Sequence, residues 1–283
     1  MNFHNATARL FAPDGEPEPL GRITHLGIGA HQDDLEFMAF HGILACYHSA
    51  TDWFGGVTCT DGAGSSRTGP YAKFTDEEMR KVRIQEQDNA ATIGRYAAMI
   101  QLDYPSRAVK SASDPALKED LKQIMEVSRP RVVYTHNPAD KHETHIGVVV
   151  AALQAMRELP PELRPQAVYG CEVWRGLDWM LDEDKVAHEV SAHENLAAAL
   201  NGVFDSQIAG GKRYDLATLG RRRANATFFE SHAADDAQMI SFAMNLTPLV
   251  VNPSLSIPEY VDTYISRFAD DVRAKLTKRL GIV

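Results

Sequence analysis

Short apolar runs typical of β-strands alternate with longer helix-like segments through the first part of the chain. The segments between the runs carry apolar residues at helical spacing, as at positions 37, 40, 44 and 47 of the segment 36–50. Strands that alternate with helices connect by right-handed crossovers into a mostly parallel sheet. We therefore predict an α/β fold with a Rossmann-like, mostly parallel sheet, helices on both faces, and strands at 24–30, 53–60, 96–102, 129–136 and 166–174.

This alternation loosens beyond about residue 176. The later sequence contains a polar helix-like segment, a glycine-rich turn and three consecutive arginines, Arg221, Arg222 and Arg223. We expect a single domain over 1–283, with a core at about 20–175 and a C-terminal helical appendage at about 176–283 that forms one wall of a pocket. The arginines predict either a contact with phosphate or carboxylate or a solvated helix face, and both interpretations stay open.

The composition excludes several classes of protein. A formal net charge of -9 leaves no basic surplus to neutralise the phosphates of a nucleic acid. Three distant cysteines provide neither a disulfide framework nor a cysteine zinc cluster. No stretch approaches the ~18 apolar residues of a membrane span, and the first residues do not resemble a secretory leader. We expect a cytoplasmic protein that binds neither nucleic acid nor membranes.

A histidine and three carboxylates follow the first apolar run, in the sequence GIGAHQDDLEF. His31, Asp33, Asp34 and Glu36 come where a strand ends and a helix begins. His31 and Asp34 can supply a nitrogen and an oxygen ligand to one metal ion, and a catalytic zinc has about three protein ligands and an open position for water. Asp33 is then free to act as the general base on the metal-bound water.

A second cluster, THNPADKHETH, follows the strand predicted at 129–136. His136, Asp140, His142 and His145 lie between this strand and an apolar helix. Because the carboxyl ends of parallel strands meet at one edge of a sheet, the cluster can supply the third ligand. His142 and His145 are three residues apart and share a helical face, so one can bind metal while the other reaches substrate.

Other interpretations of these residues exist. Asp33 and Asp34 are also typical of a first helical turn, where the helix dipole favours carboxylates. The glycines of GIGAHQDD suggest a dinucleotide loop, but Gln32 interrupts the G-x-G-x-x-G pattern and the aspartates would repel phosphates. A zinc ion that only holds the strand ends together is a further alternative, although a structural site is usually closed by a fourth protein ligand.

The two clusters resemble the signatures of the PIG-L/LmbE-like family of zinc-dependent N-acetylglucosaminyl deacetylases. AHQDDLE is similar to the family's AHPDDxE motif, and THNPADKHETH to its TH.P.D.H.DH pattern. The segments TDGAGS (60–65) and LDYPSR (102–107) also match in order, so the resemblance covers about residues 24–174. Arg83, Glu86, Ala90 and Gly94 fall like the family's R..E...A...LG helix.

The resemblance implies a role for each matching residue. Its zinc ligands would be His31, Asp34 and His145, with Asp33 as the general base. His142 would stabilise the oxyanion or protonate the leaving amine. Arg83 would contact substrate, with a surface salt bridge to Glu86 or Glu78 as the alternative.

Two departures from the family pattern affect these expectations. Gln32 replaces a proline, which we expect to loosen the turn. Thr144 stands where the family has an aspartate that would polarise the neighbouring histidine. Asp140 is the candidate to replace that carboxylate as a supporting residue if its loop brings it within hydrogen-bonding reach of His142.

The function that the resemblance implies is removal of the N-acetyl group from an N-acetylglucosamine-type substrate, with one Zn²⁺ per chain or another divalent metal. The alternatives are an amidase acting on a non-sugar N-acyl compound and a non-catalytic zinc- or sugar-binding protein. The partner would be a small amino sugar, and the family resemblance also suggests a homo-oligomer. Candidates to stack on or anchor a sugar are Tyr71, Trp174, Arg175 and Trp179, although packing and solvation explain each of them better.

Overall fold

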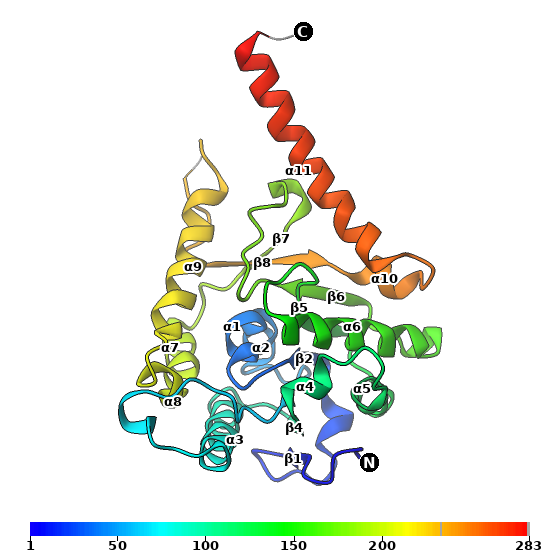
Figure 1. Ribbon diagram of the computed structural model, residues 1–283, viewed down its shortest axis with the longest axis vertical. Helices are drawn as coiled ribbons and strands as arrows, with labels where there is room; N and C mark the ends of the chain where they lie inside the picture. The colour runs from blue at the N-terminus through cyan, green and yellow to red at the C-terminus, as the bar shows by residue number, and fades with distance from the viewer. Residues whose placement is uncertain (233, 282–283) are drawn as a thin grey trace.

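A single mixed sheet of eight strands forms the centre of the computed structural model, which describes residues 1–232 and 234–281 (Figure 1). Its order is β1-β4-β3-β2-β5-β6-β8-β7. The five central strands pair in parallel, whereas β1, β8 and β7 pair antiparallel at the two edges. The strands are β1 (Arg9–Phe11), β2 (His25–Gly29), β3 (Phe54–Thr60), β4 (Ala98–Tyr104), β5 (Val132–His136), β6 (Ala167–Cys171), β7 (Val186–Glu189) and β8 (Ile240–Asn245).

Helices cover both faces of this sheet, which confirms the predicted fold class (Figure 1). Each face has its own cluster of buried apolar side chains. One face is covered mainly by α1 (Asp34–Met38), α2 (Phe40–Cys46), α3 (Asp76–Ile93), α7 (Glu194–Gly202) and α9 (Tyr214–Phe229). The other is covered by α4 (Ser106–Val109), α5 (Ala116–Ser128), α6 (Glu143–Glu158) and α10 (Thr247–Val251).

The C-terminal part of the chain contains the helices expected from the sequence and, in addition, two strands. Its strands β7 and β8 extend the central sheet through the pairing of β8 with β6. The two remaining α-helices are α8 (Asp205–Ile208) and α11 (Ile257–Leu280), and α11 projects away from the sheet (Figure 1). Within the described residues, no helix is long and apolar enough to cross a membrane. The division into one domain with a core and an appendage stays a prediction.

The helix expected at 36–50 begins two residues earlier and is interrupted at Ala39, which separates α1 from α2. Leu35 holds α1 against the sheet. A Cβ at Gly27 of β2 would lie 2.9 Å from the Leu35 side chain, and a Cβ at Gly56 of β3 would lie 2.7 Å from it. Because a side chain at either position would collide with Leu35, the two glycines determine how closely α1, which begins at Asp34, packs against the sheet.

The order of the strands reverses between β2 and β5. From β2 the chain proceeds to β3 and β4 on one side, and later from β5 to β6 on the other. At such a switch point the loops that leave the carboxyl ends of the two strands diverge and open a crevice, where α/β proteins bind ligands. The two sequence clusters leave these two strands, so both reach the same crevice.

Candidate functional site

Three side chains converge where β2 and β5 end. The Asp34 Oδ2 atom lies 3.2 Å from His31 Nδ1 and 3.4 Å from His145 Nε2, and the two histidine nitrogens lie 3.3 Å apart. A tetrahedral zinc ion with bonds of about 2.0–2.1 Å separates its ligand atoms by about 3.3–3.4 Å. The three residues expected as ligands therefore form a triangle of the size that a zinc ion requires.

Two further histidines adjoin this triangle. His136 lies 3.4 Å from Asp34 through Nε2, but that nitrogen also accepts a hydrogen bond of 2.8 Å from the backbone N–H of Ala30. His142 forms a second possible metal-binding group with His31 and His145. Since the lone pair of His136 Nε2 is engaged, His142 is the better placed of the two to reach an ion or its substrate.

The electrostatics of these groups suit a cation. Although burial opposes ionisation of Asp34, the neighbouring His145 and His136 hold its pKa well below the usual range. Burial and the neighbouring His145 lower the pKa of His142 to about 4, and the same two causes lower the pKa of His136 to about 4. Against the effect of burial, Asp34 and Asp140 raise the pKa of His145, which must lose its proton to bind a metal, whereas an ionised Asp34 is already in the form that binds one.

Asp140 supports a different histidine from the one expected. Its Oδ2 lies 3.4 Å from Nδ1 of His145, whereas its Oδ1 accepts a hydrogen bond from the backbone N–H of His142. The ring nitrogen Nδ1 of His142 is buried with no hydrogen-bond partner in the described chain. Asp140 is thus placed to orient His145, and among the described residues no carboxylate takes the place of the family's aspartate beside the His142 ring.

Replacing Asp140 by asparagine is expected to weaken metal binding by about 10- to 100-fold, because a carboxylate behind a ligating histidine fixes its tautomer and raises its basicity. Titration of the metal-free protein with zinc against a competing chelator measures this change. Asp215→Asn, at an exposed ion pair with Arg213, serves as the control. An unchanged zinc affinity in the Asp140 variant would show that His145 does not depend on this carboxylate.

Asp33 occupies a strained backbone conformation at the start of α1. Its φ of 91° lies in the left-handed region, which costs a non-glycine residue energy but suits Asp and Asn better than most. The backbone N–H of Asp33 donates to Gln87 Oε1 at 3.1 Å, and its Oδ2 accepts from Arg83 at 2.7 Å. Oδ1 has no protein partner within the described residues. Burial raises the pKa of this carboxyl to about 6, against the opposing charge of Arg83.

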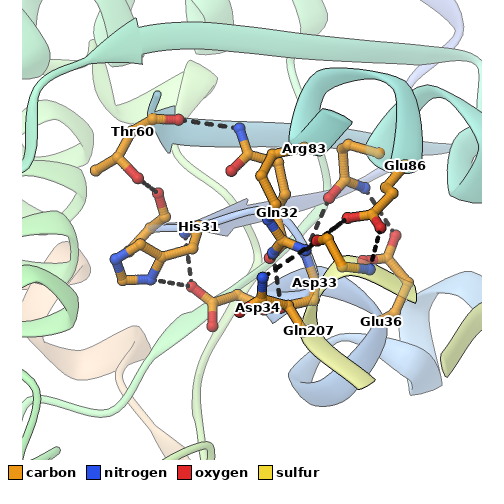
Figure 2. Close-up of polar contacts among 12 residues, drawn as sticks. His31, Gln32, Asp33, Asp34, Glu36, Thr60, Arg83, Glu86 and Gln207 are labelled. Carbon is orange, nitrogen blue, oxygen red and sulfur yellow. Dashed lines mark hydrogen bonds and ion pairs between the residues drawn. The ribbon is translucent and has the colours of Figure 1, made fainter. Parts of the chain in front are cut away.

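Arg83 lies between two carboxylates, as Figure 2 shows. It pairs with Asp33 at 2.7 Å and with Glu86 at 2.8 Å, and its side chain is only 1% exposed. Glu86 in turn accepts hydrogen bonds from the backbone and hydroxyl of Ser206. The alternative of a salt bridge with Glu86 is therefore present, but it is buried rather than on the surface, and Arg83 holds Asp33 in place from one wall of the pocket.

Replacing Arg83 by methionine is expected to lower the free energy of unfolding by about 3–5 kcal/mol, because Asp33 and Glu86 would each stay buried without their partner. Chemical denaturation of the variant measures the loss. Lys81→Met on the same helix is the matched control, since Lys81 is 71% exposed and its pair with Glu77 is solvated. Equal losses in the two variants would contradict a buried ion-pair network around Arg83.

Two glutamines complete this network: Gln32, which was expected to loosen the turn, and Gln87, which the sequence did not single out. Gln32 is buried, and its amide donates to Thr60 O at 3.1 Å, so it fastens the turn to β3 instead of loosening it (Figure 2). The Gln87 amide donates to Glu36 at 2.9 Å while its oxygen accepts from Asp33. No sequence motif marks these glutamines. Their contacts with β3, Asp33 and Glu36 became visible only in the tertiary structure.

These groups open into one pocket of about 580 Å³. His31, Asp33, Asp34 and His142 line it beyond the ends of β2 and β5, and residues of α9 form another part of its wall, as expected for the C-terminal part. Trp174 also lines it, with the Nζ atoms of Lys141 and Lys212 at 6.0 and 5.4 Å from its ring centre. Tyr71, Arg175 and Trp179, the other candidates for sugar contacts, do not line this pocket.

Residues 26–156 match the PIG-L family, whose description is GlcNAc-PI de-N-acetylase. The chain carries a PIG-L domain. It spans both clusters and all the side chains of the ligand triangle. No curated protein sequence matches the chain.

Solved structures share the fold of this chain at low sequence identity. An N,N'-diacetylchitobiose deacetylase from Pyrococcus horikoshii aligns with a TM-score of 0.60 and 14% identity, over 85% of this chain and 90% of its own. GalB, a 4-carboxy-2-hydroxymuconate hydratase from Pseudomonas putida, aligns with a TM-score of 0.61 and 18% identity, over 83% of this chain and 98% of its own. A conserved protein from Thermus thermophilus aligns with a TM-score of 0.60 and 17% identity, over 83% of this chain and 98% of its own. These similarities establish the fold of the chain.

Proposed function

We propose that this PIG-L protein is a zinc-dependent hydrolase that removes the N-acetyl group from an N-acetylglucosamine-type substrate. The observation that carries the proposal is the ligand triangle of His31, Asp34 and His145 with the unligated carboxylate of Asp33 beside it in an open pocket. A structural zinc site has no use for a spare base. The family description and the deacetylase among the structural neighbours support the same reaction.

The proposed mechanism assigns one role to each side chain. His31, Asp34 and His145 would hold a zinc ion, which supplies a Lewis acid that polarises an amide carbonyl and acidifies a water. Asp33 would take a proton from the attacking water through Oδ1, because Oδ2 is held by Arg83. It would then return the proton to the departing nitrogen.

His142 would act on the carbonyl oxygen of the substrate. Its lowered pKa leaves the ring neutral near pH 7, so one ring nitrogen can donate a hydrogen bond while carrying no charge of its own. A donor aimed at the developing oxyanion lowers the barrier because that oxygen gains negative charge in the transition state. The products are acetate and a free amine.

Hydration is the second candidate reaction, because the hydratase GalB resembles this chain in fold as closely as the chitobiose deacetylase does, with TM-scores of 0.61 and 0.60. Both reactions require an activated water, and the fold does not distinguish them. The position of Asp33 favours hydrolysis, since amide cleavage needs a group that both removes a proton and returns one to the leaving nitrogen. An amidase acting on a non-sugar N-acyl compound and a non-catalytic zinc protein are the remaining alternatives.

A product assay tests the proposal. The zinc-loaded protein is incubated with N-acetylglucosamine, its glycosides and N-acetyl amino acids, and acetate and primary amine are measured together. We expect both products in equal amounts and fastest from an amino sugar. Release from N-acetyl amino acids alone would overturn the sugar assignment, and no release from any member would overturn the deacetylase. A homo-oligomeric state and a cytoplasmic location stay predictions.

A further inference from the structure

The helix α11 is anchored to the rest of the chain through its first two turns. Ile257, Tyr260, Val261 and Tyr264 pack against the buried apolar core, and the hydroxyl of Tyr260 donates to the carbonyl oxygen of Asn245 at 2.7 Å. Beyond this base the helix projects away from the sheet for about four more turns (Figure 1). None of its 24 residues, all of which the structure describes, is fully buried.

The projecting part of α11 carries an apolar stripe, which consists of Ile265, Ala269, Val272, Leu276 and Leu280. Its four large side chains are 45%, 38%, 58% and 69% exposed, in chain order. At 3.6 residues per turn these positions share one side of the helix, about 110° away from the side that packs on the core. Large apolar side chains in an exposed row are typical of a surface that another element covers.

Both ends of α11 are defined by capping contacts. The hydroxyl of Ser256 accepts a hydrogen bond from the backbone N–H of Glu259. At the other end Gly281 adopts a φ of 65° and donates its N–H to the carbonyl oxygen of Thr277. Since most helical stability in proteins comes from packing of an apolar face, a capped helix with an exposed apolar stripe lacks a partner among the described residues.

The apolar stripe is nearly symmetric about Val272. When a second copy of the helix is placed against it in the opposite direction, Ile265 lies opposite Leu280 and Ala269 lies opposite Leu276. The larger side chain of each facing pair then meets a smaller one, except at Val272, which meets its own copy. Apolar residues at intervals of three and four positions pack together in this manner in paired helices.

The charges beside the stripe favour the same antiparallel pairing. On one flank Asp270 pairs with Arg273 at 2.8 Å, and on the other Asp271 pairs with Lys275 at 2.7 Å. Both ion pairs are centred close to Val272. In an antiparallel pair, therefore, the acid of each copy lies near the base of the other copy on both flanks.

The two ends of α11 also differ in charge. Glu259 and Asp262 lie at its base, whereas Lys278 and Arg279 lie at its tip. An antiparallel pair brings the basic tip of each copy towards the acidic base of the other, and a parallel pair would place the two basic tips together. A second copy of the chain thus complements this surface in charge as well as in shape.

We propose that the projecting part of α11 is an interaction surface for a second copy of this chain, through an antiparallel helix contact centred on Val272. Because the same surface of both copies takes part, the contact closes on itself and gives a dimer. α11 lies outside residues 26–156, so the inference depends neither on the family match nor on the proposed reaction. The contact is short, and we expect a dissociation constant of the order of micromolar.

Sedimentation velocity over protein concentrations that span the micromolar region is the first test. We expect a monomer–dimer equilibrium that Val272→Glu weakens by more than about 100-fold, because like charges that face each other oppose association. Ala274→Glu is the matched control, since it adds the same charge on the opposite, exposed side of the helix, and it should dimerise like the wild type. A monomer at every concentration, or an assembly that Val272→Glu leaves unchanged, would overturn the inference.

Disulfide cross-linking with diamide tests the direction of the two helices. In the Val272→Cys protein the two new thiols face each other, and we expect them to join, since a disulfide requires Cα atoms within about 7 Å. Leu280→Cys should not cross-link with itself, whereas a mixture of Ile265→Cys and Leu280→Cys should cross-link. Self-linking of the Leu280→Cys protein would indicate a parallel contact and overturn the antiparallel one. The wild type, with its three native cysteines, is the control.

A lipid surface is the other occupant that an apolar stripe beside lysines could have. Wild-type protein is mixed with phosphatidylcholine vesicles that contain phosphatidylserine, and the vesicles are sedimented. We expect the protein to stay in the supernatant. A protein that is monomeric in solution and binds the vesicles, but loses this binding in the Val272→Glu variant, would overturn the second copy in favour of a membrane.

Discussion

We expect the replacement of Asp33 by asparagine to lower kcat for amide hydrolysis by about 10²- to 10⁴-fold, which is the usual contribution of a general base. Asparagine keeps the shape of the side chain and, like aspartate, tolerates the left-handed φ of 91° at this position. It can still accept a hydrogen bond from Arg83, but it cannot take a proton from water. The loss is therefore expected in kcat, with KM changed much less.

Metal content and stability decide what that loss means. The Asp33→Asn protein should bind zinc as the wild type does, because Asp33 is not one of the three ligands in the triangle. Zinc is measured by mass spectrometry on the same preparations that are assayed, and folding by thermal unfolding. A fully loaded, folded variant with unchanged kcat would remove Asp33 from the mechanism.

Replacing Asp34 by asparagine or His145 by glutamine is expected to lower zinc affinity by more than about 100-fold, since loss of even a supporting residue costs about 10- to 100-fold. Each change removes one corner of the triangle, and two ligands hold a zinc ion poorly. Hydrolysis should fall to the uncatalysed rate in both variants at stoichiometric zinc. Excess zinc should restore part of the activity, because the remaining pocket is intact.

His136 and His142 provide the comparison for this experiment. His136→Asn is expected to retain zinc, because Nε2 of His136 already accepts the N–H of Ala30 at 2.8 Å. His142→Ala should retain zinc but lose rate if His142 acts on the carbonyl oxygen. Loss of zinc in the His142 variant would make it a fourth ligand and would favour the structural site over the catalytic one.

The meeting of the two sequence clusters was predictable because short-range spacing and fold class together place them, and His145 was chosen within the second cluster from the family resemblance. His31 and Asp34 are three residues apart at a strand end, and His145 follows the strand that a parallel sheet brings alongside. A periodic pattern of strands and helices is enough to place both loops at one edge. The PIG-L resemblance then distinguished Asp33 from Asp34 and His145 from His142.

The supporting contacts were not predictable in the same way. Asp140 is five residues from His145 and two from His142, so sequence distance suggested the nearer histidine, whereas the loop directs one oxygen to the backbone of His142 and the other to the ring of His145. Gln32 is adjacent to Asp33 but bonds β3, nearly thirty positions away. Such choices depend on side-chain direction, which local patterns do not record.

By itself, the sequence of this chain determined the alternating architecture, the two clusters and the residues able to bind a metal, because apolar periodicity and ligand spacing are local properties that survive in any compact arrangement of the elements. Only the tertiary structure decided which buried charges are paired. It placed Arg83 between two carboxylates, whereas the buried Arg222 of α9 forms no ion pair among the described residues and donates to backbone carbonyl oxygens of α1. Burial and pairing arise where segments distant in sequence meet, and there the cost of removing a charge from water determines its partner.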